Sequence, residues 1–128
     1  AGAQHKLGSA YHFGEGVPQD DVQAVSWWRK AADQGDAHAQ NTLGAMYHDG
    51  EGVPQDDAEA VSWLRKAADQ GHAAAQYNLG FLYYEGKGVD NDNLQAFMWI
   101  DRSASLGDEK AIRARDTLQK ALPKEIFQ

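Results

Sequence analysis

A 36-residue internal repeat constrains this chain more than any other feature of its sequence. The segment EGVPQDD at residues 15–21 recurs at 51–57, and AVSWWRKAADQG at 24–35 returns as AVSWLRKAADQG at 60–71. A third, degenerate copy keeps the register, and a fourth begins at Ala111 and ends after one helix. A fixed period of this length predicts a stack of repeated supersecondary units.

Each unit has the pattern of two helices joined by a glycine-containing turn. Leu43, Met46 and Tyr47 follow the three- and four-residue spacing of a helix face. Asp56 stands where the second helix needs an N-cap acceptor, and Gly71 stands where that helix should end. We therefore predict an all-α fold with seven helices, near residues 3–13, 20–34, 39–49, 56–70, 75–85, 92–106 and 109–122.

The units divide one domain, residues 1–128, into repeats 3–38, 39–74 and 75–110 and a capping helix over 111–122. A terminal repeat must cover the apolar face of its neighbour, and we expect Leu118 and Leu122 to do so.

Glycines and tryptophans recur at the 36-residue spacing, and we interpret both as positions where the helices pack together. Glycine inside a helix costs about 1 kcal/mol relative to alanine, so it needs a reason at positions 8, 44 and 80. We expect the second helix, with its large tryptophan, to pack closely there. The tryptophans at 27, 28, 63 and 99 are predicted to be core.

These motifs resemble the SLR family, the Sel-one-like repeats, which are longer relatives of the tetratricopeptide repeats. The first helix carries small-small-Leu-Gly-x-x-Tyr, the link reads G-x-G-V-x-x-D, and the second helix carries A-x-x-W-x-x-x-A-A-x-x-G. The likeness covers nearly the whole chain. It implies a right-handed α-solenoid of antiparallel helix pairs used as an adaptor or binding scaffold. Some members clamp each helix pair with a disulfide, whereas this chain has no cysteine.

The composition narrows the classes of partner. The formal net charge is −7 at pH 7, which argues against nucleic acid, because affinity for phosphates comes mainly from Lys and Arg. No apolar run approaches the roughly 20 residues of a spanning helix, so we expect no membrane insertion.

No basic-then-apolar leader begins the chain, so any signal peptide has been removed or never existed. The absence of cysteine leaves the redox compartment open, and we favour a periplasmic or secreted location over a cytoplasmic one.

No set of residues has the pattern of a catalytic or cofactor site. Catalysis needs a nucleophile with a base, paired carboxylates or a metal, and the serines that recur in the second helices belong to the scaffold. The alternative is a metal site formed by His12, His48 and Asp49. We predict no metal, no cofactor and no response to a chelator. His38 and His72 lie at turns between repeats and should be solvated.

Positions that vary between the copies indicate the binding surface. In a solenoid the repeated positions hold the stack, and free positions on the first helices line the concave face. By the tetratricopeptide resemblance, the partner-binding residues are His5, Ser9, His12, Asn41, His48, Asp49, Tyr77, Phe81, Tyr84 and Arg113, with Phe13, Ala45, Glu85 and Thr117 beside them. Such aromatic, histidine and amide side chains suit a peptide or a loop. The alternative for Tyr77 and Phe81 is burial under the last helix.

The leading functional hypothesis is a monomeric, bacterial-type interaction scaffold that holds another protein or peptide in its concave groove. A narrower version is an immunity protein that neutralises a secreted toxin, since family members include such inhibitors. The rivals are a hydrolase acting on cell-wall or drug-like substrates and a structural spacer within a longer chain. A nucleophile or a carboxylate pair in the groove would favour the hydrolase, and the sequence offers only Asp49 and Glu85, one in each repeat.

Overall fold

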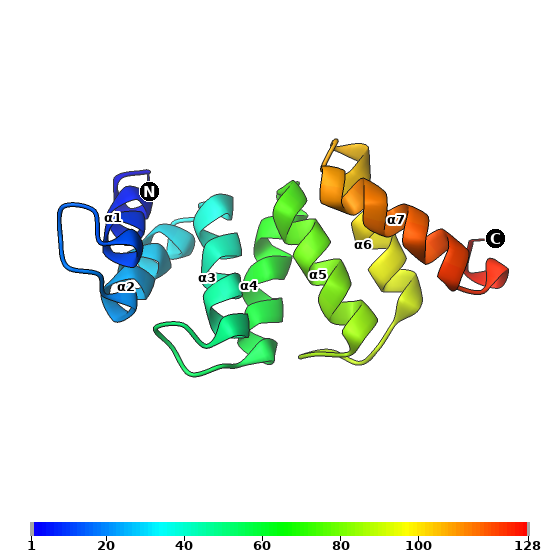
Figure 1. The fold of residues 1–128 in the computed structure, drawn as a ribbon, viewed down its shortest axis with the longest axis horizontal. Helices are drawn as coiled ribbons and strands as arrows, with labels where there is room; N and C mark the ends of the chain where they lie inside the picture. The colour runs from blue at the N-terminus through cyan, green and yellow to red at the C-terminus, as the bar shows by residue number, and fades with distance from the viewer. Residues whose placement is uncertain (1, 128) are drawn as a thin grey trace.

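In a computed structural model, residues 2–127 of the chain form seven α-helices and one short 3-10 helix. The elements are α1 (Gly2–Phe13), α2 (Asp21–Asp33), α3 (Ala37–Asp49), α4 (Asp57–Asp69), α5 (Ala73–Glu85), α6 (Asn93–Ser105), α7 (Glu109–Ala121) and η1 (Lys124–Phe127). They follow one another along one axis, with the two termini at opposite ends (Figure 1). All extensive contacts join consecutive helices. The fold is the predicted α-solenoid of antiparallel helix pairs.

Aspartates begin the second helix of each pair. The carboxylates of Asp20, Asp56 and Asp92 each accept a hydrogen bond from the backbone N–H three residues on, at 3.0–3.2 Å. Such a side chain satisfies one of the N–H groups that a helix start leaves without a partner. The predicted cap at Asp56 is confirmed.

The first helices of the second and third repeats begin two residues before the predicted starts, at Ala37 and Ala73. Asp36 caps the first of them, and its carboxylate accepts from the N–H of Ala39 at 3.2 Å. His72 caps the other, and its Nδ1 accepts from the N–H of Ala75 at 3.2 Å. Histidine is not among the usual N-cap residues, which is why the sequence pattern did not indicate this start.

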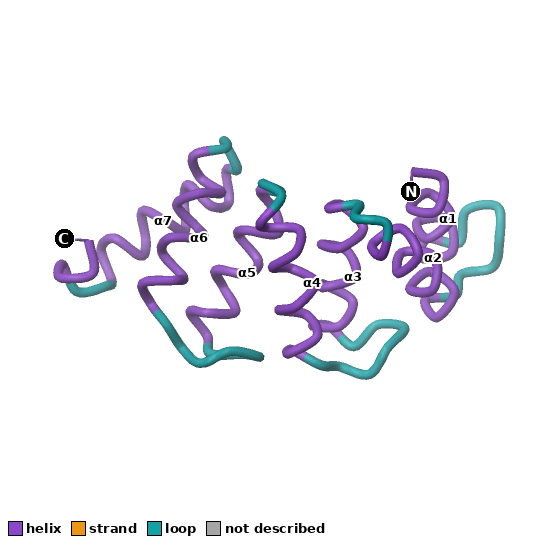
Figure 2. Tube along the Cα trace, turned by 180° about the vertical axis from the view of Figure 1, so that it is seen from behind, coloured by secondary structure: helices purple, strands orange, loops and turns teal. Residues whose placement is uncertain are grey.

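Two kinds of connection alternate along the solenoid (Figure 2). A long loop joins the helices within each repeat, and a short turn joins one repeat to the next. The long loops after α3 and α5 leave the helix through Gly50 and Gly86, whose φ angles of 71° and 69° are left-handed. These angles favour glycine, because a Cβ is disfavoured in that region.

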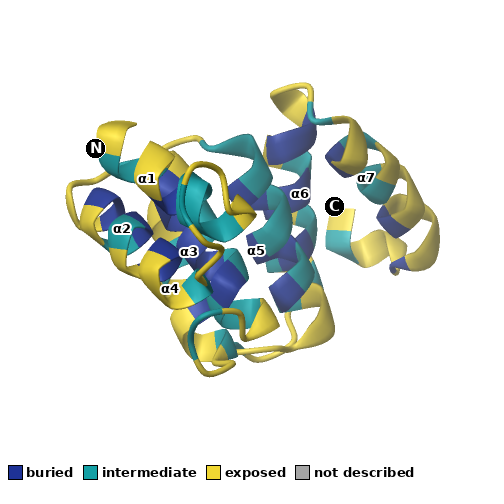
Figure 3. Cartoon of the chain, turned by 60° about the vertical axis from the view of Figure 1, so that its left-hand side comes forward, coloured by how far each residue is buried: buried dark blue, intermediate teal, exposed yellow. Residues whose placement is uncertain are grey.

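The core lies between successive helices rather than at one centre, and Figure 3 shows the buried positions on their facing sides. Small residues and leucines fill it, including Leu43, Leu64 and Leu79, which are 2% exposed or less. Leu118 and Leu122 of the C-terminal segment are buried against Ile100. The predicted cap is therefore confirmed. None of the helices in residues 2–127 is long and apolar enough to cross a membrane.

The recurrent glycines of the first helices mark close helix contacts, as predicted, but the partner differs from the prediction. A Cβ built on Gly44 would lie 2.8 Å from Cγ of Leu64, and one on Gly80 would lie 2.6 Å from Cγ1 of Ile100. At Gly8 the neighbour is the indole of Trp28. The partner is thus the residue after the recurrent tryptophan, which points directly at the first helix.

The recurrent tryptophans themselves lie further round the second helix. Trp99 is buried, and so is Trp28, in agreement with the prediction. Trp27 and Trp63 are only half-buried; Trp63 still packs against the core cluster that contains Leu43, so its predicted core position is confirmed in part. A lysine ammonium lies over the ring of each: Nζ of Lys30 is 4.3 Å from the centroid of the Trp27 ring, and Nζ of Lys66 is 4.5 Å from the centroid of the Trp63 ring.

Polar contacts repeat at each junction between repeats. Gln40 is buried, and its side-chain amide donates to the backbone carbonyl of Ala32 at 3.1 Å; Gln76 repeats this contact with Ala68. The guanidinium of Arg29 donates to the hydroxyl of Tyr47 in the next repeat. Each tie therefore joins one repeat to its immediate neighbour.

Candidate functional site

The surface formed by the first helices, α1, α3, α5 and α7, is hollowed between successive members. We call it the first-helix face. The ten predicted partner-binding residues all line its hollows: His5, Ser9 and His12 from α1, Asn41, His48 and Asp49 from α3, Tyr77, Phe81 and Tyr84 from α5, and Arg113 from α7. The structure thus brings them onto one face, and their role in binding stays a prediction.

The hollow between α5 and α7 has a volume of about 330 Å³ and an aromatic wall. Tyr77 and Phe81 stand side by side, with ring centroids 4.9 Å apart, and Tyr84 continues the row with 39% of its surface exposed. The opposite wall, from α7, carries the cationic side chains of Lys110 and Arg113. An apolar surface beside positive charge is available here to another molecule.

Tyr77 and Phe81 pack against the core and also line the hollow between α5 and α7. Both are half-buried and pack against the cluster that contains Leu118, and both still line the hollow. Burial raises the pKa of the Tyr77 hydroxyl above its usual value, with a further rise from Asp108. The last helix therefore covers Tyr77 and Phe81 in part, and Tyr84 is the most accessible member of the row.

The hollow between α3 and α5 is more acidic. Its volume is about 350 Å³, and its residues include His48, Asp49 and Glu85. Asn78 lines it as well and donates to the side-chain oxygen of Asn41 at 3.1 Å, so an amide pair crosses from α5 to α3. The α7 side of the first-helix face carries Lys110 and Arg113 with Asp108 and Glu109 beside them at the start of α7, whereas the hollow between α3 and α5 carries Asp49 and Glu85.

Three histidines, in α1, in α3 and at the N-cap of α5, form a ladder at one edge of this face. The rings of His5 and His38 have centroids 4.4 Å apart, and those of His38 and His72 are 5.6 Å apart. Nδ1 of His38 lies 3.4 Å from Nε2 of His72. His38 is exposed, as expected, whereas the prediction of solvation is wrong for His72, which is half-buried as the cap of α5.

Two members of the ladder, His5 and His72, favour their neutral form. Burial lowers the pKa of His5 and of His72 below 6.5, and the charge of His38 lowers both further, while Asp36 acts in the opposite direction. The N-cap of α5 also requires a neutral His72, since its Nδ1 can accept from the N–H of Ala75 only when it carries no proton. Below about pH 6.5 the unfolded chain takes up protons before the folded chain does, so the stabilisation present above that pH is lost as the pH falls.

His12 and His48 do not meet Asp49 in the way that the alternative metal site required. Each bonds instead to the first residue of the following helix: Nδ1 of His12 lies 2.7 Å from Oδ1 of Asp21, and His48 repeats this with Asp57 at 2.7 Å. Sequence reasoning missed both pairs. The signal is the recurrence of His and Asp nine residues apart across the EGVPQDD loop.

This architecture, three helix pairs and a capping helix with a hollowed first-helix face, defines an α-helical repeat protein. Sel1 repeats match residues 1–36, 37–72 and 73–108. The chain belongs to the Sel1 repeat family, whose members are typically non-enzymatic scaffolds for protein–protein interaction. The comparison with curated proteins gives no match.

Solved structures agree with this assignment. A protective antigen of uropathogenic Escherichia coli with an SLR fold is 46% identical, with a TM-score of 0.85 over 86% of this chain and 24% of the antigen. A Sel1 repeat protein from Oxalobacter formigenes is 40% identical, with a TM-score of 0.86 over 89% of this chain and 47% of that protein. The chain thus spans less than half of either relative. Cysteine rich protein B of Helicobacter pylori, at 23% identity and a TM-score of 0.73 over 88% of this chain and 92% of its own, shares the fold.

Proposed function

We propose that the first-helix face binds an extended segment of a partner protein, with the hollow between α5 and α7 as its anchor. The observation that carries this is the exposed Tyr84 beside the half-buried Tyr77 and Phe81, facing a cationic wall. Interface hot spots concentrate in aromatic and arginine side chains at a site from which water is excluded. A hollow of about 330 Å³ suits one or two apolar side chains of the partner.

The charges along the face support a particular chemistry for the segment. An acidic residue would lie against Lys110 and Arg113, an apolar residue against the aromatic row, and a basic residue against Asp49 and Glu85. Charge complementarity of this kind fixes the direction of a bound chain and suppresses wrong partners. Inhibition of a secreted toxin is one function such a face could serve, and it is a narrower version of the same proposal.

The test is selection of displayed random peptides on the intact chain, followed by calorimetry of the best binder. We expect selected peptides to combine an apolar residue with an acidic one. Tyr84→Ala should weaken binding by about 2 kcal/mol, and Arg113→Glu should weaken peptides with an acidic residue most. Both residues are exposed, so the circular dichroism of these variants should match that of the parent.

Lys30→Ala and Lys66→Ala are the matched controls, since both lysines lie on second helices, outside the first-helix face. They should leave the affinity unchanged. If these two changes abolished binding while Tyr84→Ala and Arg113→Glu did not, the binding surface would lie on the second helices, and the proposal would be wrong.

A further inference from the structure

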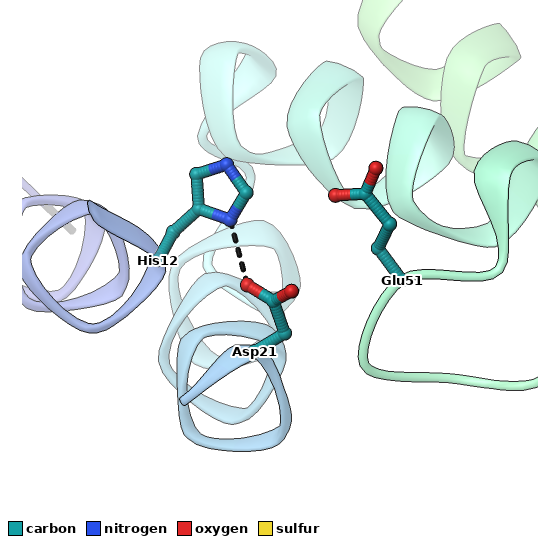
Figure 4. Close-up of side chains that lie close together, drawn as sticks. All are labelled: His12, Asp21 and Glu51. Carbon is teal, nitrogen blue, oxygen red and sulfur yellow. Dashed lines mark hydrogen bonds and ion pairs between the residues drawn. The ribbon is translucent and has the colours of Figure 1, made fainter. Parts of the chain in front are cut away.

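Three potential metal ligands meet at the junction between the first and second repeats (Figure 4). His12 lies in the last turn of α1, Asp21 is the first residue of α2, and Glu51 belongs to the loop between α3 and α4. One ligand atom from each lies within 4.8 Å of the others. Among residues 2–127, these three side chains form the one such cluster of His, Asp and Glu.

The loop that carries Glu51 is held against the start of α2 by its glycines. Gly50 and Gly52 have left-handed φ angles of 71° and 73°. A Cβ on Gly52 would lie 2.7 Å from the backbone carbonyl carbon of Asp21 and 3.0 Å from Cγ2 of Val25. Only a glycine permits this approach. The position of Glu51 beside Asp21 therefore follows from the packing of the loop.

The chemistry of the three groups suits one class of ion. Two carboxylates this close repel each other unless a cation lies between them, and an imidazole nitrogen adds a softer ligand. Zn²⁺ takes histidine nitrogen and carboxylate oxygen at about 2.0–2.2 Å, which places tetrahedral ligands about 3.4 Å apart. That spacing lies between the 2.7 Å from Nδ1 of His12 to Oδ1 of Asp21 and the 4.8 Å within which all three ligand atoms lie. Ca²⁺ and Mg²⁺ prefer oxygen ligands alone.

Contrary to the absence of metal expected from the sequence, we propose that His12, Asp21 and Glu51 bind one Zn²⁺-like divalent transition-metal ion, with water completing the coordination. The exposed side chain of Glu51 closes onto the His12–Asp21 pair, and the proton of the neutral His12 ring moves through water to Nε2, so that Nδ1 binds the metal. Since Glu51 belongs to the second repeat and the other two ligands to the first, the ion joins two repeats and stabilises their junction.

The next junction is an internal control. His48 and Asp57 reproduce the pair at 2.7 Å, and a Cβ on Gly88 would collide with the backbone of Asp57 as one on Gly52 would with Asp21. The residue at the position equivalent to Glu51 is Lys87, whose ammonium lies 3.5 Å from a carboxylate oxygen of Glu85. A cation in place of the third ligand excludes a second metal ion. The chain should therefore bind one ion.

The experiment is calorimetric titration of the full, untagged chain with ZnCl₂, with CaCl₂ and MgCl₂ as controls. We expect one Zn²⁺ per chain, a rise in melting temperature with Zn²⁺, and no binding of the other two ions. Glu51→Gln should weaken Zn²⁺ by more than tenfold while leaving the melting temperature without zinc unchanged, because its side chain is exposed. Lys87→Glu should raise the stoichiometry to two.

The control variant is His48→Gln, which removes a histidine–aspartate pair that lacks a third ligand and should leave Zn²⁺ binding as it is. Three results would each overturn the proposal: no binding of Zn²⁺ by the intact chain, unchanged affinity in Glu51→Gln, or loss of binding on replacing His38 or His72. The last result would place the ion on the histidine ladder. None of these outcomes bears on peptide binding between α5 and α7.

Discussion

Replacing Gly44 with alanine adds one methyl group at the tightest point between α3 and α4. Two effects oppose each other. Alanine stabilises a helix interior by about 1 kcal/mol relative to glycine. Against this, the new Cβ would lie 2.8 Å from Cγ and 2.9 Å from Cδ2 of Leu64, and 3.3 Å from the backbone oxygen of Ala60.

The geometry decides which effect is larger. Leu64 is 2% exposed and borders the hollow between α3 and α5 on one side only, and its Cγ must move by about 0.6 Å to restore an ordinary contact. Forced movement in a packed core costs about 1–3 kcal/mol. Subtracting the helix propensity leaves a net destabilisation of up to about 2 kcal/mol. For a domain of this size, that lowers the melting temperature by as much as about 8 °C.

Urea unfolding followed by circular dichroism and tryptophan fluorescence measures the effect. Gly2→Ala is the control, because nothing lies within 4 Å of its new Cβ, and it should not destabilise the chain. In a Leu64→Ala background the space is free, so Gly44→Ala should become neutral or stabilising there, with a coupling energy above about 1 kcal/mol. A single variant Gly44→Ala more stable than the parent would refute the close packing of α3 on α4.

Two further outcomes are expected. Lowering the pH from about 7.5 to 5.5 should lower the melting temperature, because His5 and His72 take up protons on unfolding. His72→Asp, which copies the cap at Asp36, should make thermal unfolding less sensitive to pH, and an unchanged pH profile would contradict this account. Deleting residues 109–128 should destabilise the chain by about 3–6 kcal/mol, since two buried leucines are lost, and a truncated chain with the parental solubility and melting temperature would contradict the capping role.

The helices and the cap could be predicted from the sequence because their signals are local and occur in several copies. Glycine, proline and aspartate mark the loops at one spacing, and apolar periodicity marks each helix. Leu118 and Leu122 could be identified because an end repeat must present an apolar face to its neighbour. The predicted starts of α3 and α5 are wrong by two residues; at α5 the histidine cap has no strong pattern in sequence, whereas at α3 the cap, Asp36, is a usual one that sequence reasoning missed.

The sequence predicted which residues share the first-helix face, but not which residues contact one another there. Helical register places Tyr77, Phe81 and Tyr84 on one side of α5, and they do line one hollow. The share of Tyr77 that the last helix covers depends on how closely α7 approaches, which no spacing encodes. The proximity of Glu51 to His12 depends on a loop of one repeat docking onto the helix start of another, and helical spacing says nothing about that contact.

The ties between neighbouring repeats have a mechanical consequence. Because Gln40, Arg29 and their counterparts reach only the adjacent repeat, no hydrogen bond among residues 2–127 joins one end of the solenoid to the other. We therefore expect a pull on the two ends to be taken up as small rotations at the junctions between repeats. The hollows of the first-helix face lie at those junctions, so we expect tension to change their shape and the fit of whatever lies on that face.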